Sequence, residues 1–402
     1  MTDVILTLNA GSSSLKFSLF RIGSAAWLTP VLQGEVETGG IATHFQATDQ
    51  AGATLADEQW PDGKFDQWLG KTIGWVEAHI GTDRLVAVGH RVVHGGPEHD
   101  RPERVTPELL LALERLKPLA PLHEPHNLVP ILAIAASRPD LPQVACFDTA
   151  FHHGMPVVAT RFALPRDYEA AGIRRYGFHG LSYEYIANRL HEAAPDLARG
   201  RIIAAHLGNG ASLCAMRDGR SVDTTMGFTA LDGLVMGTRC GAIDPGVILY
   251  LQQQRGLSPA EIQDLLYKRS GLLGVSGGIS SDMRILLASA DARAREAIEL
   301  FVYRIGRDIG ALASSLGGLD GLVFTAGIGA HSPEIRALVC ARLGWLGVVI
   351  DPEANRRSDL VISAASSRVQ VRVMPTDEEA MIARHTLAAI RGADGAARLP
   401  AA

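Results

Sequence analysis

The same arrangement of two apolar segments around a small polar turn occurs twice in this chain. The first occurrence covers residues 4–20, where β-branched and other apolar segments enclose the turn Asn-Ala-Gly-Ser-Ser-Ser at 9–14. The second covers residues 201–220, with Leu-Gly-Asn-Gly-Ala-Ser at 207–212 and a tight turn at 217–220. Such patterns predict strands joined by turns. Their recurrence predicts a duplicated architecture with two similar domains.

The length of the chain also favours two domains. Its 402 residues exceed what one hydrophobic core usually organises, and 47% apolar with 20% charged residues is an ordinary globular composition. No low-complexity linker separates the halves. We therefore expect an N-terminal domain of residues 1–148, a second domain of residues 149–383, and a C-terminal helix, 384–402, that packs back on the first domain.

Charge and cysteine content exclude several classes of partner and site. A net charge of -5 gives no electrostatic reason to expect nucleic acid or an anionic membrane as a partner. The four cysteines are far apart and form no CxxC pair, which fits a reducing cytoplasm better than a disulfide framework or a zinc site. The N-terminus lacks a basic region, and no apolar run approaches the ~20 residues that span a bilayer. We expect a cytoplasmic protein.

The remainder of the chain has a mixed α/β pattern. Helical periodicity and apolar segments predict the following elements: helices at 107–117, 182–192, 297–316 and 377–390, strands at 85–88, 143–147 and 321–324, and a loop at 325–329.

Three glycine-rich turns, each directly after an apolar strand, are candidates for phosphate binding. They lie at residues 9–16, 207–212 and 327–329. Backbone N–H groups and hydroxyls of such turns suit phosphate oxygens, and Lys16 could reach a γ-phosphate. None has the spacing of a Walker A loop. One such turn alone could equally be a polar hairpin with a solvated lysine, but three together favour a nucleotide site.

Five polar side chains stand where chemistry could occur. Arg91 lies among glycines and could hold a carboxylate or phosphoryl group, or form a surface ion pair. Asp148 directly follows a strand, which suits a magnesium-related carboxylate or a helix N-cap. His179 stands between a phenylalanine and a glycine, and Arg239 has small neighbours on both sides. His123, in a proline-rich loop, could be structural.

Cys240 directly follows Arg239 in the sequence. A neighbouring guanidinium could favour the reactive thiolate form. Alternatively, Cys240 is a buried, small apolar residue.

Motifs of other enzyme classes do not occur. The sequence contains no GxSxG, no HExxH, no GxGxxG that opens a helix, and no HRD or DFG pair. Hydrolase, zinc protease and dehydrogenase functions therefore have no support.

Taken together, these segments strongly resemble the acetate kinase family, including its propionate and butyrate kinases. The matching segments are NAGSSSLKFSLF at 9–20, GHRVVHGG at 89–96, FDTAFH at 147–152, RRYGFHG at 174–180, HLGNGAS at 206–212, MGFTALDGLVMGTRCGAIDPG at 226–246, SGLLGVSGGISSDMR at 270–284, FTAGIG at 324–329 and TDEEAMIA at 376–383. The resemblance implies the actin/Hsp70/sugar-kinase (RNase H-like) fold, two α/β domains around a nucleotide cleft, with a mixed five-stranded sheet in each. It also implies a homodimer.

The resemblance further implies ATP- and Mg²⁺-dependent, reversible phosphorylation of acetate to acetyl phosphate, with ADP as the other product and Mn²⁺ as a substitute metal. Propionate or another short-chain acyl substrate is the alternative. The second domain would bind the nucleotide. The implied metal residues are Asn9 and Glu378, with Asp148 nearby. The implied catalytic residues are Arg91, His123, Asp148, His179 and Arg239.

Substrate and nucleotide residues follow from the same resemblance. Arg91 would bind the carboxylate, and the acyl pocket would consist of Val93, Leu122, Phe178 and Ala230. The residues facing the phosphates would be Ser12, Ser14, Lys16, His206, Leu207, Gly208, Asn209 and Gly210. The residues at the adenosine end would be Asp282, Met283, Arg284, Gly327, Ile328, Gly329, Ala330 and His331.

Three positions depart from the family pattern. Ala230 stands where proline is common, and residues 330–331 read Ala-His where Glu-Asn is common. The His123 loop reads HEPHN instead of HNPxN. The charged residues of the phosphoryl centre are unchanged.

The chemistry of a carboxylate acceptor separates this reaction from that of other kinases. A carboxylate is already ionised at neutral pH and needs no general base, so we assign Asp148 mainly to positioning magnesium and water. A non-catalytic ATPase of the same fold would need neither Arg91 nor Arg239. A sugar kinase would need polar side chains where Val93 and Phe178 stand.

Overall fold

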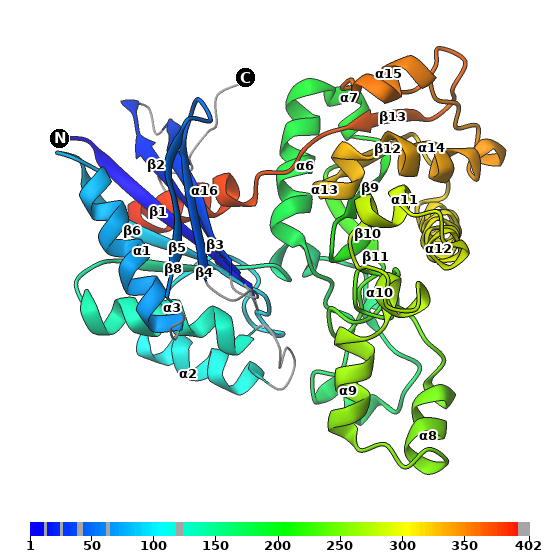
Figure 1. Cartoon of the computed structure of the whole chain (residues 1–402), viewed down its shortest axis with the longest axis horizontal. Helices are drawn as coiled ribbons and strands as arrows, with labels where there is room; N and C mark the ends of the chain where they lie inside the picture. Colours follow the sequence, from blue (N-terminus) through cyan, green and yellow to red (C-terminus); the bar gives the residue numbers. More distant parts are fainter. Residues whose placement is uncertain (12–13, 25–26, 38–42, 62–64, 118–123, 393–402) are drawn as a thin grey trace. The chain divides into compact units, whose positions relative to one another are not determined.

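A computed structural model of the chain describes residues 1–11, 14–24, 27–37, 43–61, 65–117 and 124–392, with the backbone alone for 65, 66 and 124–126. The chain forms two compact units (Figure 1). Unit 1 contains Met1–Phe151 and the chain from Asp377 onward, and unit 2 contains His152–Thr376. The sequence suggested divisions at residues 148 and 383, whereas the units divide after Phe151 and after Thr376.

Unit 1 is a sheet with helices on both faces. Its elements are β1 (Asp3–Ala10), β2 (Ser14–Ile22), β3 (Leu28–Glu37), β4 (Thr43–Asp49), β5 (Thr54–Trp60), α1 (Phe65–His79), β6 (Arg84–Val92), β7 (Glu103–Arg104), α2 (Pro107–Leu116), α3 (Glu124–Ser137), β8 (Gln143–Phe147) and α16 (Glu378–Arg391), with the short η3 (Ala150–His152) at its boundary. The strand order is β5-β4-β3-β2-β1-β6-β8-β7.

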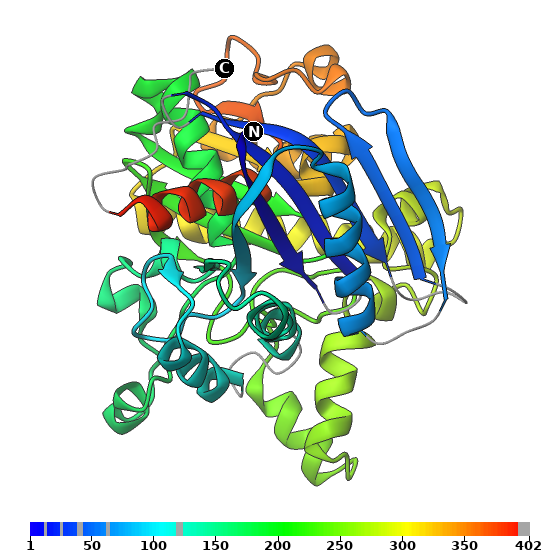
Figure 2. The same cartoon turned by 90° about the vertical axis from the view of Figure 1, so that its left-hand side faces the viewer.

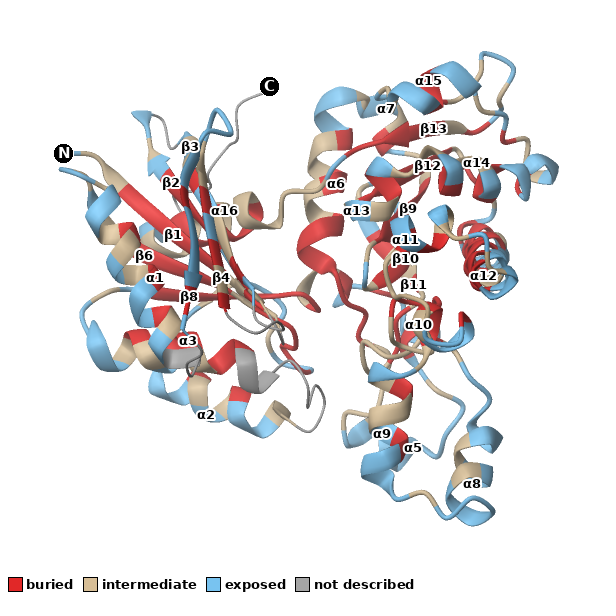
Figure 3. Ribbon diagram, in the orientation of Figure 1, coloured by how far each residue is buried: buried red, intermediate tan, exposed pale blue. Residues whose placement is uncertain are grey.

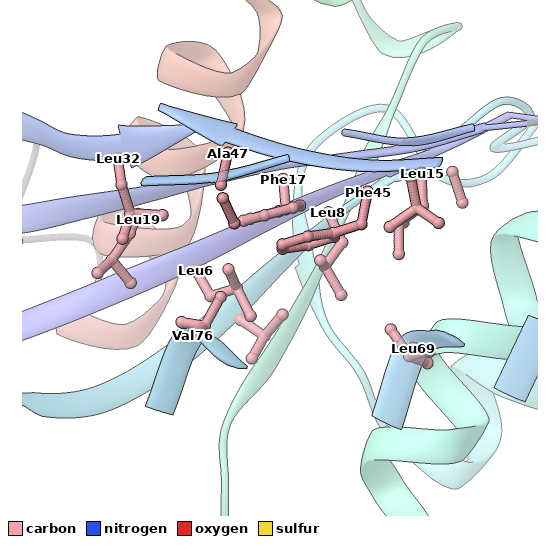
Figure 4. Packing of buried hydrophobic residues seen from close by; sticks show 14 of the residues in the cluster. Leu6, Leu8, Leu15, Phe17, Leu19, Leu32, Phe45, Ala47, Leu69 and Val76 are labelled. Carbon is pink, nitrogen blue, oxygen red and sulfur yellow. The ribbon is translucent and has the colours of Figure 1, made fainter. Parts of the chain in front are cut away.

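The core of unit 1 follows from the alternation of side chains along its strands. On β1, Leu6 and Leu8 pack toward α1 and α3 with Phe17 of β2, as Figure 4 shows. Ile5 lies on the opposite face, in a cluster with Leu387 of α16. Figure 2 shows α1 in front of this sheet. Complete burial of one such side chain stabilises the fold by about 1.5–3 kcal/mol. Both faces of β1 are therefore covered, one of them by the C-terminal helix.

Unit 2 contains a second sheet. Its elements are α4 (Val157–Thr160), α5 (Arg166–Ala170), α6 (Gly180–Ala193), α7 (Pro195–Ala198), β9 (Arg201–Leu207), β10 (Ala211–Arg217), β11 (Arg220–Thr224), α8 (Pro245–Gln253), α9 (Pro259–Lys268), α10 (Gly271–Val275), α11 (Met283–Ala288), α12 (Ala292–Leu316), β12 (Gly321–Thr325), α13 (Ala326–His331), α14 (Pro333–Ala341), η4 (Gly344–Leu346), α15 (Pro352–Arg357) and β13 (Gln370–Val373). The strand order is β11-β10-β9-β12-β13, and Figure 1 shows this sheet between α6 and α12.

The two sheets confirm the predicted duplication. The order β3-β2-β1-β6-β8 in unit 1 corresponds to β11-β10-β9-β12-β13 in unit 2. In both, the first three strands pair antiparallel and the last two join in parallel. The expectation of five strands in each domain was wrong for unit 1. Its sheet continues from β3 to β4 and β5, and from β8 to β7. The hairpin of β4 and β5 pairs with β3, whereas β11, the corresponding strand of unit 2, is the edge strand of its sheet.

Two predicted elements differ from the structure in extent or type. The long helix α12 begins at Ala292 instead of residue 297, because Asp291 caps it by accepting a hydrogen bond from the backbone of Arg293 at 2.8 Å. The predicted loop at 325–329 is instead the short helix α13, entered through Ala326 in the left-handed region (φ 62°). None of the helices within the described residues is long and apolar enough to cross a membrane.

Candidate active site

The candidate residues of unit 1 gather where three parallel strands end. β1 pairs in parallel with β6, and β6 with β8, so their carboxyl ends lie side by side at the same end of the sheet. Asn9, Arg91 and Asp148 lie at these ends. Lys16 on β2 lies opposite Asn9, and Glu35 on β3 lies opposite Lys16. The strand topology thus aligns polar residues in one row.

Arg91 is the centre of this group. Its Nε and Nη2 donate to Oδ2 of Asp148 at 2.9 and 2.5 Å, and its Nη1 donates to Oδ1 of Asn9 at 3.3 Å. Nδ2 of Asn9 in turn donates to Oε2 of Glu378 at 3.4 Å and to Oε1 of Glu379 at 3.3 Å. The Arg91 side chain is 16% exposed and that of Asp148 is 1% exposed. The ion pair is therefore largely buried, unlike the surface pair considered above.

Helix α16 brings the two glutamates to the strand ends. Asp377 caps the helix by accepting a hydrogen bond from the backbone N–H of Ala380 at 2.8 Å. Glu378 and Glu379 occupy its first turn, where the helix dipole favours negative charge. The helix crosses β6 at Gly89, where a β-carbon would lie 2.1 Å from Oγ1 of Thr386. Only glycine permits this close approach.

Burial and neighbouring charges together raise the pKa values of both Arg91 and Glu378. Burial alone would lower the pKa of Arg91, but the charges of Asp148 and Glu378 outweigh it and raise that pKa above its ordinary value. Burial raises the pKa of Glu378, and the nearby carboxylates of Asp148 and Glu379 raise it further, against the opposing charges of Arg91 and Lys16. The positive charges of Arg91 and Lys16 thus face the three carboxyl groups of Asp148, Glu378 and Glu379 at these strand ends.

The donor set of unit 1 fits a hard divalent cation. Oδ1 of Asp148 is buried and has no hydrogen-bond partner among the described residues, and a buried acceptor of this kind is costly unless a water or an ion satisfies it. Within the described part of the chain, no three or more His, Cys, Asp or Glu side chains converge on a metal position. Magnesium, however, usually takes only one or two protein carboxylates and completes its shell with water and phosphate oxygens. The oxygens of Asn9 and Glu378, with Asp148 beside them, meet that requirement.

Asn127 supports this edge and was missed by sequence reasoning. Its Oδ1 accepts a hydrogen bond from the backbone N–H of Val93 at 2.9 Å, and its Nδ2 donates to the carbonyl of Ala10 at 2.7 Å. The side chain is fully buried. Asn127 therefore ties the end of β1 to the end of β6. A lone amide before the apolar run Leu-Val-Pro-Ile-Leu was the signal that could have indicated a buried, bonded role.

The other predicted residues of unit 1 differ in their placement. Val93 is buried, Ser14 begins β2 and Lys16 is exposed. The remaining three, Ser12, Leu122 and His123, lie outside the described residues.

In unit 2, His179 belongs to a buried hydrogen-bonded group. It stands before α6 with φ 58° and ψ 27°, a left-handed conformation that is unusual for a residue with a side chain. Its Nδ1 lies 2.8 Å from Oγ of Ser212, which lies 2.5 Å from the hydroxyl of Tyr183. The ring of His206 stacks on that of His179 at 4.1 Å, and its Nδ1 lies 2.8 Å from Oγ of Ser182. Nδ1 of His179 bonds to Ser212, so Nε2 is the ring nitrogen that faces away from that serine.

Gly210 is the point at which His179 and Arg239 meet. A β-carbon on Gly210 would lie 2.9 Å from Nη2 of Arg239 and 3.2 Å from Nε2 of His179. A guanidinium and an imidazole nitrogen thus lie close to one glycine of the second phosphate-binding turn. Fixed donors at one point are what stabilises a charged group during transfer.

The segment that carries Arg239 is held from two sides. Nη1 of Arg239 donates to the carbonyl of Ala230 at 2.7 Å, so residue 230 contacts this arginine through its main chain. The backbone N–H of Gly237 donates to the carbonyl of Asn209 at 2.9 Å. A β-carbon on Gly271 (φ 61°) would lie 2.2 Å from the carbonyl of Met236, so the chain passes closely behind the segment.

The remaining predicted residues of unit 2 lie around the ends of strands and short helices. Residues 327–331 form α13 directly after β12, and Phe178 is buried beside His179. Asp282 caps α11, Met283 is buried, and Arg284, 90% exposed at its side chain, pairs with Asp282. Two of these three side chains therefore bond to each other at the surface.

Cys240 is partly buried, and its surroundings favour the unreactive alternative. Burial raises the pKa of its thiol to about 11, in spite of the neighbouring arginine. Its Sγ–H donates to the carbonyl of Gly241 at 3.1 Å. A neutral, hydrogen-bonded thiol is a weak nucleophile.

Comparisons with known proteins agree along almost the whole chain. The sequence model described as the acetokinase family matches residues 4–384. The acetate kinase of Rhodopseudomonas palustris is 55% identical over 390 residues, which cover 96% of this chain and 98% of that protein. The structure is similar to a propionate kinase from Francisella tularensis, with a TM-score of 0.88, 36% identity and coverage of 96% and 99%. It is also similar to the acetate kinase of Porphyromonas gingivalis, with a TM-score of 0.84, 38% identity and coverage of 96% and 100%.

Proposed function

Because this chain belongs to the acetokinase family, we propose that it transfers the γ-phosphoryl group of ATP to acetate and forms acetyl phosphate and ADP, reversibly. The family assignment makes the chain a kinase whose acceptor is a carboxylate. The observation that carries the proposal is the meeting of Arg239 and His179 at Gly210. Two fixed hydrogen-bond donors at a glycine-rich turn of the kind that binds phosphate can stabilise a phosphoryl group while it is transferred.

The carboxylate acceptor is assigned to Arg91. Asp148 occupies the Nε and Nη2 edge of that guanidinium, whereas within the described part of the chain Nη1 bonds to Asn9 alone, at a longer distance. In the proposed enzyme, Asp148 is thus a positioning residue that holds the arginine while Nη1 binds the substrate carboxylate. No base is required, since the acceptor oxygen is already ionised at neutral pH.

The difficulty of the reaction is electrostatic, because an anion must approach a polyanion. Arg91, Arg239 and Lys16 supply positive charge, and His179 adds a hydrogen-bond donor. An arginine that stabilises a phosphoryl group in transfer is worth roughly 10³–10⁵ in rate. Asn9 and Glu378 would hold Mg²⁺, with Mn²⁺ as a substitute, and that ion supplies neutralisation of phosphate charge.

Nucleotide binding is assigned mainly to unit 2, as the nucleotide-binding domain. The turn at 206–210 would contact the phosphates, together with Ser12, Ser14 and Lys16 of unit 1. Residues 282–284 and 327–331 would contact the adenosine. The support is that 206–210 and 327–331 follow the parallel strands β9 and β12 at their carboxyl ends, where ligands of α/β sheets bind.

The acyl pocket is assigned to Val93, Leu122, Phe178 and Ala230, with His123 as a nearby helper. Alanine at position 230 favours activity on propionate as well as acetate, because its methyl group fills less space than the proline ring common in the family. The similarity to a solved propionate kinase is compatible with a short-chain acyl kinase as the alternative.

We also propose that the protein is a homodimer and lies in the cytoplasm. Helix α8 has no buried residue, as its exposed and intermediate colours in Figure 3 show. Its apolar Val247, Leu249 and Tyr250 are 39%, 53% and 54% exposed. An unburied helix with exposed apolar side chains suits a dimer surface. The four cysteines are free thiols, which fits a reducing compartment.

The test is a coupled assay of purified protein with ATP, Mg²⁺ and a panel of acetate, propionate, butyrate and sugars. We expect acetyl phosphate, trapped as the hydroxamate, in amounts that match the ADP released. Arg239→Ala should abolish its formation. Hydrolysis of ATP at the same rate without any carboxylate, or phosphorylation of a sugar instead, would contradict the proposal.

A further inference from the structure

Arg336 is a cation in the interior of unit 2. It lies on α14, and its relative exposure is 0%, which makes it one of the largest fully buried side chains of the chain. No carboxylate among the described residues forms an ion pair with it. A buried charge without a counter-charge is costly unless hydrogen bonds replace those of water.

Neutral acceptors satisfy the whole guanidinium. Its Nε donates to Oδ1 of Asn355 at 2.8 Å. Nη1 donates to the carbonyls of Gly329 and Ala330 at 3.0 and 2.8 Å. Nη2 donates to the carbonyl of Asn355 at 2.7 Å and to Oγ of Ser358 at 2.9 Å. A guanidinium has five N–H donors, so each of them has an acceptor here.

These bonds join two segments that are distant in sequence. Gly329 and Ala330 belong to α13, the short helix after β12, whose last carbonyls have no partner within so short a helix. Asn355 lies on α15, and Ser358 follows that helix with φ 55°. Asn355 also donates from Nδ2 to the carbonyl of Pro333 at 2.8 Å, which closes the group around the start of α14. The guanidinium therefore fixes the end of α13 against α15.

We propose that Arg336 is a positioning residue for the nucleotide: it holds the carbonyls of Gly329 and Ala330 so that α13 keeps the shape that the adenosine end of ATP requires. This inference rests on the proposed function, which assigns residues 327–331 to the adenosine. Because Arg336 is fully buried, it would act on the nucleotide only through α13. It should therefore affect nucleotide affinity far more than the acceptor or the phosphoryl step.

Arg336→Lys tests this role. An ammonium keeps the charge but has three donors on a single atom, so it cannot reach both carbonyls of α13 and both groups of Asn355. We expect the KM for ATP to rise about tenfold, because one or two hydrogen bonds from a charged donor are lost. The Kd for ADP, measured by calorimetry without turnover, should rise by the same factor. The KM for acetate and kcat at saturating ATP should change less than about twofold.

Arg372→Lys is the matched control. Arg372 is also a largely buried arginine of unit 2, at 7% exposure, but its Nε bonds to Gln370 on β13 and not to α13. A general loss of stability would affect both variants, whereas only Arg336→Lys should weaken nucleotide binding. Unchanged ATP and ADP affinity in Arg336→Lys, or an equal loss in Arg372→Lys, would overturn the proposal.

Ser358→Gly keeps the test decisive if Arg336→Lys does not fold. Glycine accepts the left-handed backbone of residue 358, so only the Oγ acceptor is lost. The KM for ATP should then rise about two- to threefold with kcat retained, since one of five bonds is removed. No rise would count against the proposal. A wild-type protein without ATP-dependent acetyl phosphate formation would instead refute the proposed function, whatever the variants show.

Discussion

Thr386 of α16 lies directly against the α-carbon of Gly89 on β6, so close that a β-carbon on Gly89 would stand 2.1 Å from its Oγ1. Gly89→Ala should therefore push α16 away from the sheet. Overpacking of this kind costs about 1–3 kcal/mol, and it should also reduce kcat because Glu378 and Glu379 begin the same helix.

Gly70→Ala is the control for that variant. Gly70 lies within α1 with nothing near its missing β-carbon, so alanine should stabilise the protein slightly, by about 0.5–1 kcal/mol. Denaturant unfolding followed by circular dichroism measures both effects. Equal stability of Gly89→Ala and wild type would show that α16 is not fixed by this contact.

Gly210→Ala should separate activity from stability. The new methyl group would meet the ends of two side chains, Arg239 and His179, which can move aside without distorting the backbone. We expect the melting temperature to stay within a few degrees of wild type while kcat falls by about 10²-fold or more, because a displaced donor no longer meets the transferring group. A fully active variant would mean that these donors are not aimed at the phosphoryl group.

Arg91→Ala should lower both activity and stability, and a second substitution should restore only stability. Removal of the guanidinium leaves the buried carboxylate of Asp148 without its partner, at a cost of about 3–5 kcal/mol. In Arg91→Ala/Asp148→Asn that charge is gone, so most of the loss should be recovered while activity stays abolished. Urea midpoints and hydroxamate assays of the two single variants and the double variant supply the complete cycle. Strictly additive losses of stability would contradict a coupled buried pair.

Ala230→Pro should narrow the acyl pocket. The proline ring adds about two methylenes of wall, each worth ~0.8 kcal/mol when buried, while its carbonyl remains able to accept from Arg239. We expect the parent to use acetate and propionate with kcat/KM values within about tenfold of each other, and the variant to lose propionate activity selectively. Equal losses on both substrates would place residue 230 outside the pocket and implicate its bond to Arg239 instead.

Acid should destabilise the protein through three buried histidines. Burial lowers the pKa of His90, His94 and His152 to about 4 in the folded state, against an ordinary value near 6.5. The unfolded chain therefore binds more protons between these values, and stability is lost as the pH falls from about 6.5 to 4. Each histidine should contribute about 2 kcal/mol of this loss by pH 5. His90→Asn should reduce the loss of unfolding free energy between about pH 6.5 and 5 by the contribution of one histidine. An unchanged pH dependence of the unfolding free energy would mean that His90 is protonated in the folded protein.

Much of the fold and part of the site could be predicted from local patterns. The duplicated hairpins were visible because each places an apolar strand on either side of a glycine-rich turn. Arg91 and Asp148 were recognisable as candidates because they lie at the end of, or directly after, a short apolar strand, whereas the metal role of Asn9 came only from the family resemblance. The added strands β4 and β5 were not predicted, since their sequences, THFQATD and TLADEQW, contain few large apolar residues.

Contacts that join distant parts of the chain could not be predicted. Gly89 looked like a flexible neighbour of Arg91, yet its role depends on Thr386, almost three hundred residues later. Asn127 and Arg336 are polar side chains whose roles depend on hydrogen bonds to other segments of the chain, and the local sequence does not reveal these partners. The short helix α13 was read as a loop because its glycines favour loops when nothing else is known, whereas Arg336 holds its last carbonyls.

Helix α16 has a consequence for the order in which the protein can fold during its synthesis. The face of the first sheet that carries Ile5, Phe20 and Ala87 is covered by Ala383 and Leu387. A ribosome makes those strands before unit 2 and that helix after it. Unit 1 can therefore complete its fold only after unit 2 has been synthesised. Until α16 emerges from the ribosome, the apolar face of the first sheet stays uncovered on the nascent chain, where it is exposed to aggregation.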